Sequence, residues 1–131
     1  MLRTPSLRLR PFDRQDTPAL FGFMSDPLAM RFTHVASSLE QCQARLSAFE
    51  ARRSSHGFAP WVILGADPHA VLGWGGLLID PHEPHWGLKI GYAFHPCCWG
   101  QGYGTELVQF SLAHAFAELA ANEVCALVSC P

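Results

Sequence analysis

The chain has little charge and lacks long apolar runs, and each shortage argues against a class of function. Charged residues make up 15% of its 131 residues and the net charge is −2, which leaves no electrostatic footprint for nucleic acid or an anionic membrane. No apolar run approaches the ~20 residues of a membrane span. The N-terminal residues Met1 to Pro5 hold no apolar signal core. We therefore expect a cytoplasmic protein with neither nucleic acid nor membrane as a partner.

Paired cysteines and metal-ligand spacings are also missing. The cysteines are odd in number and irregularly spaced, which predicts reduced thiols rather than a disulfide framework; they are Cys42, Cys97, Cys98, Cys125 and Cys130. The stretch from His82 to His85 contains a proline and lacks the helical spacing of a zinc site, so a turn with two exposed histidines is favoured. We expect no metal.

The apolar content, 49% of the chain, is enough for one domain with a sizeable core. Apolar alternation and β-rich runs predict strands over 7–10, 58–64, 71–79, 88–94 and 123–129. Helical spacing predicts helices over 18–24, from 39 to about 56, and over 107–121. The turn at 65–69 predicts that 58–64 and 71–79 pair as an antiparallel hairpin.

Local signals predict the helix ends and the buried faces. Thr17 is the expected N-cap of the first helix, and Ser38 to Gln41 form a capping box for the second. The first helix is expected to bury Leu20, Phe21 and Met24. For the second helix we expect one apolar face and a set of water-exposed arginines: Leu39, Cys42, Leu46 and Phe49, against Arg45, Arg52 and Arg53.

The most informative stretch runs from His95 to Glu106 and contains Gly100, Gly102 and Gly104. It lies between a predicted strand and a predicted helix. The first N–H groups of a helix have no internal partner and the helix dipole is positive there, so such a turn directs hydrogen-bond donors at a phosphate. Glycine lets an anion approach the main chain closely and permits a positive φ. We expect the turn to hold the pyrophosphate of a nucleotide-bearing cofactor.

Two other phosphate motifs fit the spacing less well. A P-loop needs Lys-Ser or Lys-Thr after its last glycine, where Thr105 and Glu106 stand here. A dinucleotide fingerprint needs a third glycine near Thr105, and although Glu123 has roughly the acidic spacing, the strand before the turn lies late in the chain. A purely structural, tightly packed loop is the remaining alternative.

The residues from Pro96 to Glu106 read Pro-x-x-Trp-Gly-x-Gly-x-Gly-Thr-Glu. This pattern resembles the acetyl-CoA-binding motif of the GNAT superfamily of N-acetyltransferases, and more narrowly its RimJ/RimL-like branch, in which a tryptophan such as Trp99 commonly replaces the first residue of the general motif. Residues 4–12 and 71–77 resemble the first and third strands of that branch. The resemblance implies a single GNAT-like domain over 1–131 that ends before the family's last helix and two strands.

This resemblance implies an α+β fold: a mostly antiparallel sheet of about five strands with three helices, and a V-shaped splay between the fourth and fifth strands. It implies acetyl-CoA as co-substrate and no metal. The pantetheine arm would lie along the strand 88–94, whose small face at Gly91 and Ala93 would admit the arm or a closely packed helix. The implied cofactor-binding residues are Tyr92, Phe94 and His95 through their backbone, and Trp99, Gly100, Gln101, Gly102, Tyr103, Gly104 and Thr105.

The chemistry implied by the resemblance is direct transfer of an acetyl group to a primary amine, on a small molecule or a protein N-terminus. Relatives often carry a catalytic glutamate where Lys89 stands, so the base is unassigned and the candidates are His95, His34 and Glu83. A non-catalytic acyl-CoA-binding or regulatory module is the alternative, which Lys89 favours. A homodimer that covers the edge of the last strand is a further hypothesis.

Overall fold

The computed structural model describes residues 2–26, 36–67, 69–79, 88–118 and 125–126. Within these residues a single sheet has its strands side by side in chain order: β1 (Leu2–Arg3), β2 (Arg8–Arg10), β3 (Trp61–Leu64), β4 (Val71–Ile79), β5 (Leu88–Phe94) and β6 (Cys125–Ala126). Neighbours are antiparallel from β1 to β5, and β6 is parallel to β5. The expected mostly antiparallel α+β fold is confirmed. The short edge strand β1 was not predicted.

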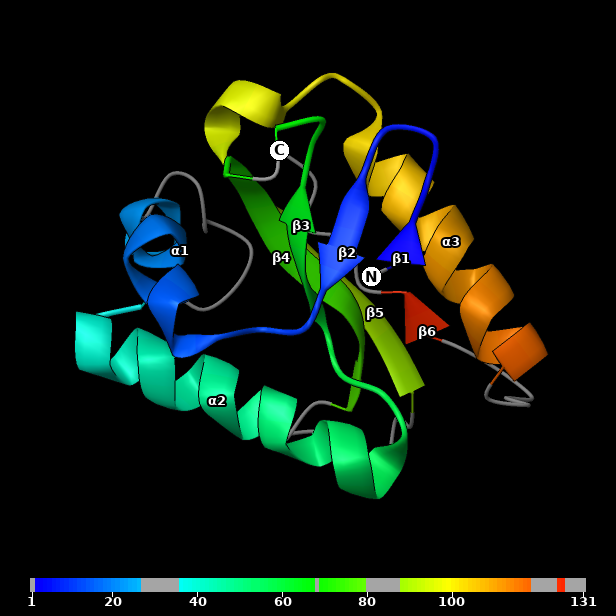
Figure 1. Cartoon of the computed structure of the whole chain (residues 1–131), viewed down its shortest axis with the longest axis horizontal. Helices are drawn as coiled ribbons and strands as arrows, with labels where there is room; N and C mark the ends of the chain where they lie inside the picture. The colour runs from blue at the N-terminus through cyan, green and yellow to red at the C-terminus, as the bar shows by residue number, and fades with distance from the viewer. Residues whose placement is uncertain (1, 27–35, 68, 80–87, 119–124, 127–131) are drawn as a thin grey trace.

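Three helices cover the two faces of the sheet (Figure 1). α1 (Thr17–Met24) and α2 (Leu39–His56) lie on one face, and α3 (Tyr103–Glu118) crosses the other. Side chains of β3 alternate between the two cores, so that Val62 packs with the α1–α2 side and Ile63 with the α3 side. Because both faces are covered, all of β3 is buried, which explains its continuous apolar sequence.

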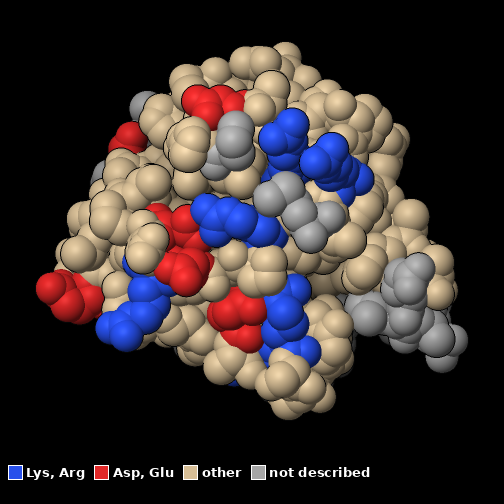
Figure 2. All heavy atoms as spheres, in the orientation of Figure 1, with Lys and Arg blue, Asp and Glu red and all other residues tan. Residues whose placement is uncertain are grey.

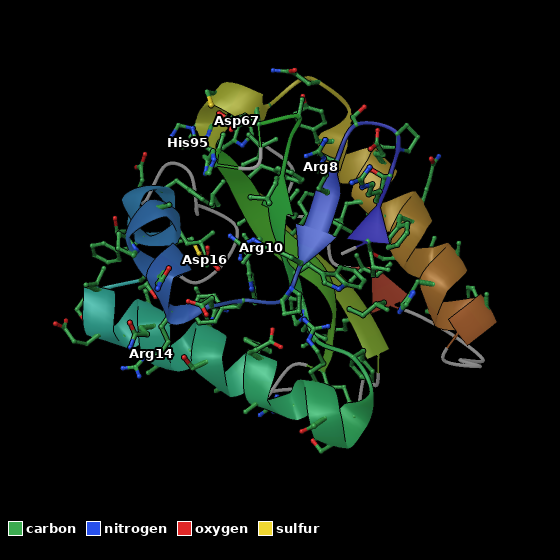
Figure 3. The ribbon with its side chains drawn as sticks, in the orientation of Figure 1. Arg8, Arg10, Arg14, Asp16, Asp67 and His95 are labelled. Atoms are coloured by element: carbon green, nitrogen blue, oxygen red, sulfur yellow. The ribbon has the colours of Figure 1, made fainter. Side chains whose placement is uncertain are left out.

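The start of α1 differs from the expectation. Its N-cap is Asp16, Thr17 is already helical, and a 3-10 turn, η1 (Arg14–Asp16), precedes it. The Asp16 carboxylate does not cap α1, because Arg10 donates to it twice, at 2.6 and 2.7 Å, and the Asp13 N–H donates to it at 2.9 Å in the capping box of η1. Figure 3 shows Arg10 pointing toward Asp16. The pair ties the end of β2 to the start of α1.

The faces of α1 and α2 were predicted in part. Phe23, rather than the half-buried Phe21, joins the buried Leu20 and Met24 on α1. On α2 the prediction holds for Cys42, Leu46 and Phe49, but Leu39 is 40% exposed because it lies in the first turn, beyond the edge of the core.

The caps and arginines of α2 also deviate from the expectation. Ser38 accepts from the Gln41 N–H at 3.0 Å, but the Gln41 side chain returns to Ser37 instead of closing the box on Ser38. The arginines are half-buried rather than freely hydrated: Arg52 donates to the Ile79 carbonyl at 3.3 Å and Arg53 to the Pro60 carbonyl at 3.0 Å. Their donors satisfy carbonyls at the ends of strands and loops.

A close contact between Trp61 and Gly76 fixes the position of α3 on the sheet. Gly76 has φ 135°, and a Cβ there would lie 2.5 Å from the Trp61 ring. The other side of Trp61 meets Phe110 and His114 of α3, with ring centroids 5.8 and 5.6 Å away. The register also shifts between Ile63 and Leu64. The glycines of β4 thus mark a close approach and an irregular register, as the sequence indicated.

Candidate functional site

The chain between β5 and α3 is held by its own hydrogen bonds. The His95 N–H donates to the Leu72 carbonyl at 2.8 Å, which extends the β4–β5 ladder by one residue. A 3-10 turn, η3 (Pro96–Cys98), follows. The Cys98 N–H donates to the His95 carbonyl at 2.8 Å and the Trp99 N–H to the Pro96 carbonyl at 3.1 Å. These hydrogen bonds fix the conformation of the first half of the loop, which leads directly into the glycines.

The second half of the loop presents main-chain donors. The Gly102 carbonyl accepts from the Glu106 N–H at 3.0 Å, which makes Gly102 the residue before the first helical turn. In this fully described segment, the six N–H groups from Gly100 to Thr105 make no hydrogen bond. Gly100 and Gly102 have φ 81° and 78°, and nothing lies within 4 Å of a Cβ built at either. Unpaired donors at a helix N-terminus, with open space beside them, suit an anion.

The other edge of β5 presents further main-chain groups. Because His95 pairs with Leu72 through a hydrogen bond, alternation along an antiparallel ladder turns the N–H groups of Tyr92 and Phe94 away from β4. Among the described residues, β6 pairs with β5 only at Lys89 and Ile90. The N–H groups of Tyr92 and Phe94 thus lie on the edge of β5 that faces away from β4, whereas the His95 N–H and carbonyl are bonded within the fold.

The aromatic side chains of the loop pack onto β5. The Trp99 indole N–H donates to the Phe94 carbonyl at 3.1 Å, and the Tyr103 ring lies 6.1 Å from that of Phe94. Gly104 sits directly on Tyr92, since a Cβ at Gly104 would be 2.7 Å from the Tyr92 hydroxyl oxygen. These contacts dock the first turn of α3 on β5 and leave the main-chain donors exposed.

The small face of β5 is packed. Ala93 belongs to the core formed with α1 and α2, and a Cβ at Gly91 would lie 3.3 Å from the Leu78 side chain. Ile90 and Phe94 lie on the α3 side, as the alternation predicted. The small face was expected to admit either a pantetheine arm or a closely packed helix, and the burial of Ala93 supports close packing. The part of β5 that is not packed in this way is its edge away from β4.

The contacts of Glu106, the last residue of the motif, were not predicted from the sequence. Its carboxylate accepts hydrogen bonds from the Thr4 hydroxyl and, at 2.8 Å, from the Ser6 N–H. Burial alone raises the pKa of Glu106, but the hydrogen bonds from Thr4, Ser6 and Leu7 outweigh burial and lower its pKa. The negative charge of the first turn of α3 is thus directed at the N-terminal segment.

The predicted base candidates are only partly described. His34 and Glu83 lie outside the described residues. His95 is exposed at the end of β5, on the side that carries α1, and its ring meets Phe23 edge-on with centroids 5.9 Å apart (Figure 3). Its Nδ1 accepts from the Cys97 N–H at 3.1 Å, so the neutral ring carries its proton on Nε2 and presents a donor. Lys89, which stands where the resemblance predicts a catalytic glutamate, is 1% exposed.

The described part of the chain contains no group of three or more metal-ligating side chains. The stretch 82–85 lies outside it. No helix in that part is long and apolar enough to cross a membrane. Figure 2 shows acidic and basic side chains next to one another over the middle of one face, as expected from a net charge of −2.

Comparison with known proteins places this geometry in a family. The sequence model of the acetyltransferase (GNAT) domain matches residues 6–130. A curated relative, the uncharacterized N-acetyltransferase YoaA of Bacillus subtilis, is 26% identical over 132 aligned residues, which cover 98% of this chain and 73% of that protein.

Solved structures share the fold at low sequence identity. RimL, a ribosomal L7/L12 α-N-protein acetyltransferase in complex with coenzyme A, superposes with a TM-score of 0.63 at 19% identity, covering 86% of this chain and 64% of that one. Spermidine N-acetyltransferase from Vibrio cholerae, in complex with coenzyme A and spermine, gives a TM-score of 0.68 at 17% identity, covering 90% and 68%.

Proposed function

Because the chain belongs to the GNAT acetyltransferase family, we propose that it transfers an acetyl group from acetyl-CoA to a primary amine. The observation that carries this proposal is the run of six unpaired N–H groups from Gly100 to Thr105 at the start of α3. Those donors and the positive end of the helix dipole would hold the pyrophosphate without any basic side chain. Indeed, no Lys or Arg follows Lys89 in the sequence.

The edge of β5 supplies the second part of the site. We assign the N–H groups of Tyr92 and Phe94 to the amides of the pantetheine arm and to the thioester carbonyl, because both turn away from β4. Donors fixed in a strand stabilise negative charge that develops on that oxygen during attack. The exposed Gln101 and Thr105 side chains would face the nucleotide. Trp99, Tyr103 and His95 would support these groups by shaping the loop.

Transfer needs a neutral amine, and a base must remove its proton. His95 presents Nε2–H in its neutral form, so this ring would accept a proton only at Nδ1, after giving up its bond with the Cys97 N–H. We therefore assign the deprotonation to His34 or Glu83 ahead of His95. Direct attack on the thioester requires no covalent enzyme intermediate, and neither Cys97 nor Cys98 is given a role in it.

The acceptor is proposed from the motif and from the neighbours. The Pro96 to Glu106 motif resembles that of the RimJ/RimL-like branch, and RimL acts on a protein N-terminus. Spermidine N-acetyltransferase acts on a small polyamine. Both acceptors are primary amines, which is the class we propose here, in the cytoplasm. We also propose a second copy of the chain as the partner beside β6, which is the last strand of the sheet among the described residues.

The proposed loop is tested by binding of CoA measured by calorimetry. Gly102→Val forces a β-branched residue to φ 78° and should lower the affinity for CoA at least tenfold, which is about 1.4 kcal/mol of binding free energy. Gly57→Val is the matched control: Gly57 has φ 83°, is equally open, and ends α2 away from the loop. Equal CoA affinity for the two variants would refute the loop assignment.

A second function is favoured by Lys89, which stands where the resemblance leads us to expect a carboxylate base and which is 1% exposed. A non-catalytic acyl-CoA-binding or regulatory module would bind CoA through the same donors but transfer nothing. A thiol-release assay with acetyl-CoA and a panel of amines and N-terminal peptides separates the two functions. Turnover with any amine supports the enzyme, while CoA binding without turnover on the whole panel supports the module.

A further inference from the structure

Two neighbouring thiols lie at the base of the proposed CoA loop. Cys97 and Cys98 are in η3, and their Sγ atoms are 3.7 Å apart. Cys97 is exposed, whereas Cys98 is 5% exposed and packs in the core on the α3 side. The remaining thiol with a described side chain, Cys42, is buried in the opposite core. The pair therefore combines one sulfur that solvent reaches with a second sulfur in contact with it.

We propose that Cys97 and Cys98 are a peroxide-sensitive dithiol that closes to a disulfide and thereby disturbs the loop that follows. In the first step Cys97 Sγ attacks an oxygen of hydrogen peroxide, the O–O bond breaks, and Cys97 sulfenic acid and water form. In the second step Cys98 Sγ attacks the Cys97 sulfur, the S–O bond breaks, and the disulfide and a second water form. Two electrons pass from the two thiols to one peroxide.

The environment divides the two roles. Burial, followed by the contact with Cys97, raises the pKa of Cys98 to about 11, so Cys98 stays a thiol while solvent-borne peroxide meets Cys97 first. Adjacent Cα atoms are about 3.8 Å apart, which is less than the usual ~4.4–6.8 Å across a disulfide. The closed pair is therefore strained, and strained disulfides are the easily reduced ones. A reversible change follows.

The consequence for the loop comes from the peptide between the two cysteines. That turn is held by the Cys97 N–H on His95 Nδ1 at 3.1 Å and by the Cys98 N–H on the His95 carbonyl at 2.8 Å. The Cys97 carbonyl in turn accepts from the Gln101 side chain at 3.4 Å. Closing the sulfurs from 3.7 Å to bonding distance must rotate this peptide. Gly100 to Gly102 follow directly, so their donors move as well.

Formation of the disulfide between Cys97 and Cys98 is tested by mass spectrometry on the whole protein treated with hydrogen peroxide. A glutamate-specific protease cuts after Glu50 and Glu106 but not between Glu83 and Pro84, so peptide 51–106 contains Cys97 and Cys98 and no other cysteine. Its mass should fall by two hydrogen atoms and recover with dithiothreitol. Cys98→Ser should stop at a sulfenic acid that dimedone traps, and Cys97→Ser should resist oxidation. Cys42→Ser, the matched control, should behave like the wild type. Added oxygen without loss of hydrogen would overturn the proposal.

The effect of the disulfide on CoA binding rests on the proposed function and is measured separately. Oxidation should weaken CoA binding about tenfold in the wild type and leave Cys97→Ser unchanged. A disulfide that forms without any change in CoA affinity would overturn the coupling to the loop. If the reduced wild type itself fails to bind CoA, the proposed function fails, while the peptide mass still decides the dithiol chemistry.

Discussion

Gly104 offers a direct test of how α3 is docked on the sheet. It is the second residue of α3, and an alanine Cβ there would lie 2.7 Å from the Tyr92 hydroxyl oxygen and 2.9 and 3.0 Å from ring carbons. Helix propensity alone favours alanine by about 1 kcal/mol. Overpacking costs about 1–3 kcal/mol. We expect Gly104→Ala to lower the free energy of unfolding by about 1 kcal/mol, which lowers Tm by about 3–5 °C.

A double-mutant cycle isolates the contact. In a Tyr92→Leu background the ring is gone, so Gly104→Ala should stabilise by about 1 kcal/mol, which makes the coupling about 2 kcal/mol. Gly22→Ala is the matched control, because Gly22 is an exposed helical glycine with nothing within 4 Å of its Cβ position and should gain about 1 kcal/mol. Urea unfolding of all variants provides the free energies. Stabilisation by Gly104→Ala equal to that by Gly22→Ala would refute the reasoning.

Three further predictions concern stability and pH. Ser111→Ala should stabilise by about 1 kcal/mol in urea unfolding, because its hydroxyl is buried without a partner among the described residues; a loss would imply a partner. Arg10→Met should lower the free energy of unfolding by about 2–3 kcal/mol, because it leaves the Asp16 carboxylate buried without its cation. The cost should stay below the ~3–5 kcal/mol of a fully buried pair because the Arg10 side chain is 28% exposed. A cost under about half a kcal/mol would contradict this. Because the pKa of Glu106 is lowered in the fold, this carboxylate stabilises the protein fully above its ordinary pKa of 4.5, and the stabilisation is lost as pH falls through the lowered pKa. Glu106→Gln should therefore flatten that part of the acid unfolding curve. An unchanged curve would count against the Thr4 contact.

Much of the fold follows from local pattern in the sequence. The strand predicted over 71–79 has those bounds in β4, and the glycine that ends α2, Gly57, has the positive φ that such an end requires. These features depend on neighbours within a few residues of each other. The start of α1 was misplaced because the carboxylate of Asp16 is held by Arg10, a residue of another element.

The loop before α3 was predicted as an anion site from its glycines, and its open N–H groups are what such a site needs. The part that pattern alone missed was which amides are used. The N–H groups of Trp99 and Glu106 are bonded within the turns on either side, and the His95 N–H belongs to the sheet. Each of these depends on where η3 ends and α3 begins, since one residue more or fewer in a turn changes which donors are satisfied.

The order of strands and helices, the apolar faces and the glycine-rich turn were determined by the sequence itself, because each expresses a preference of the backbone or of burial over a short span. Tertiary structure alone decided that Thr4 and Ser6 meet Glu106 across a hundred residues, that Trp61 lies on Gly76, and that the sulfur of Cys98 is buried while that of Cys97 is exposed. Such contacts join segments far apart in the chain, and no local spacing encodes them.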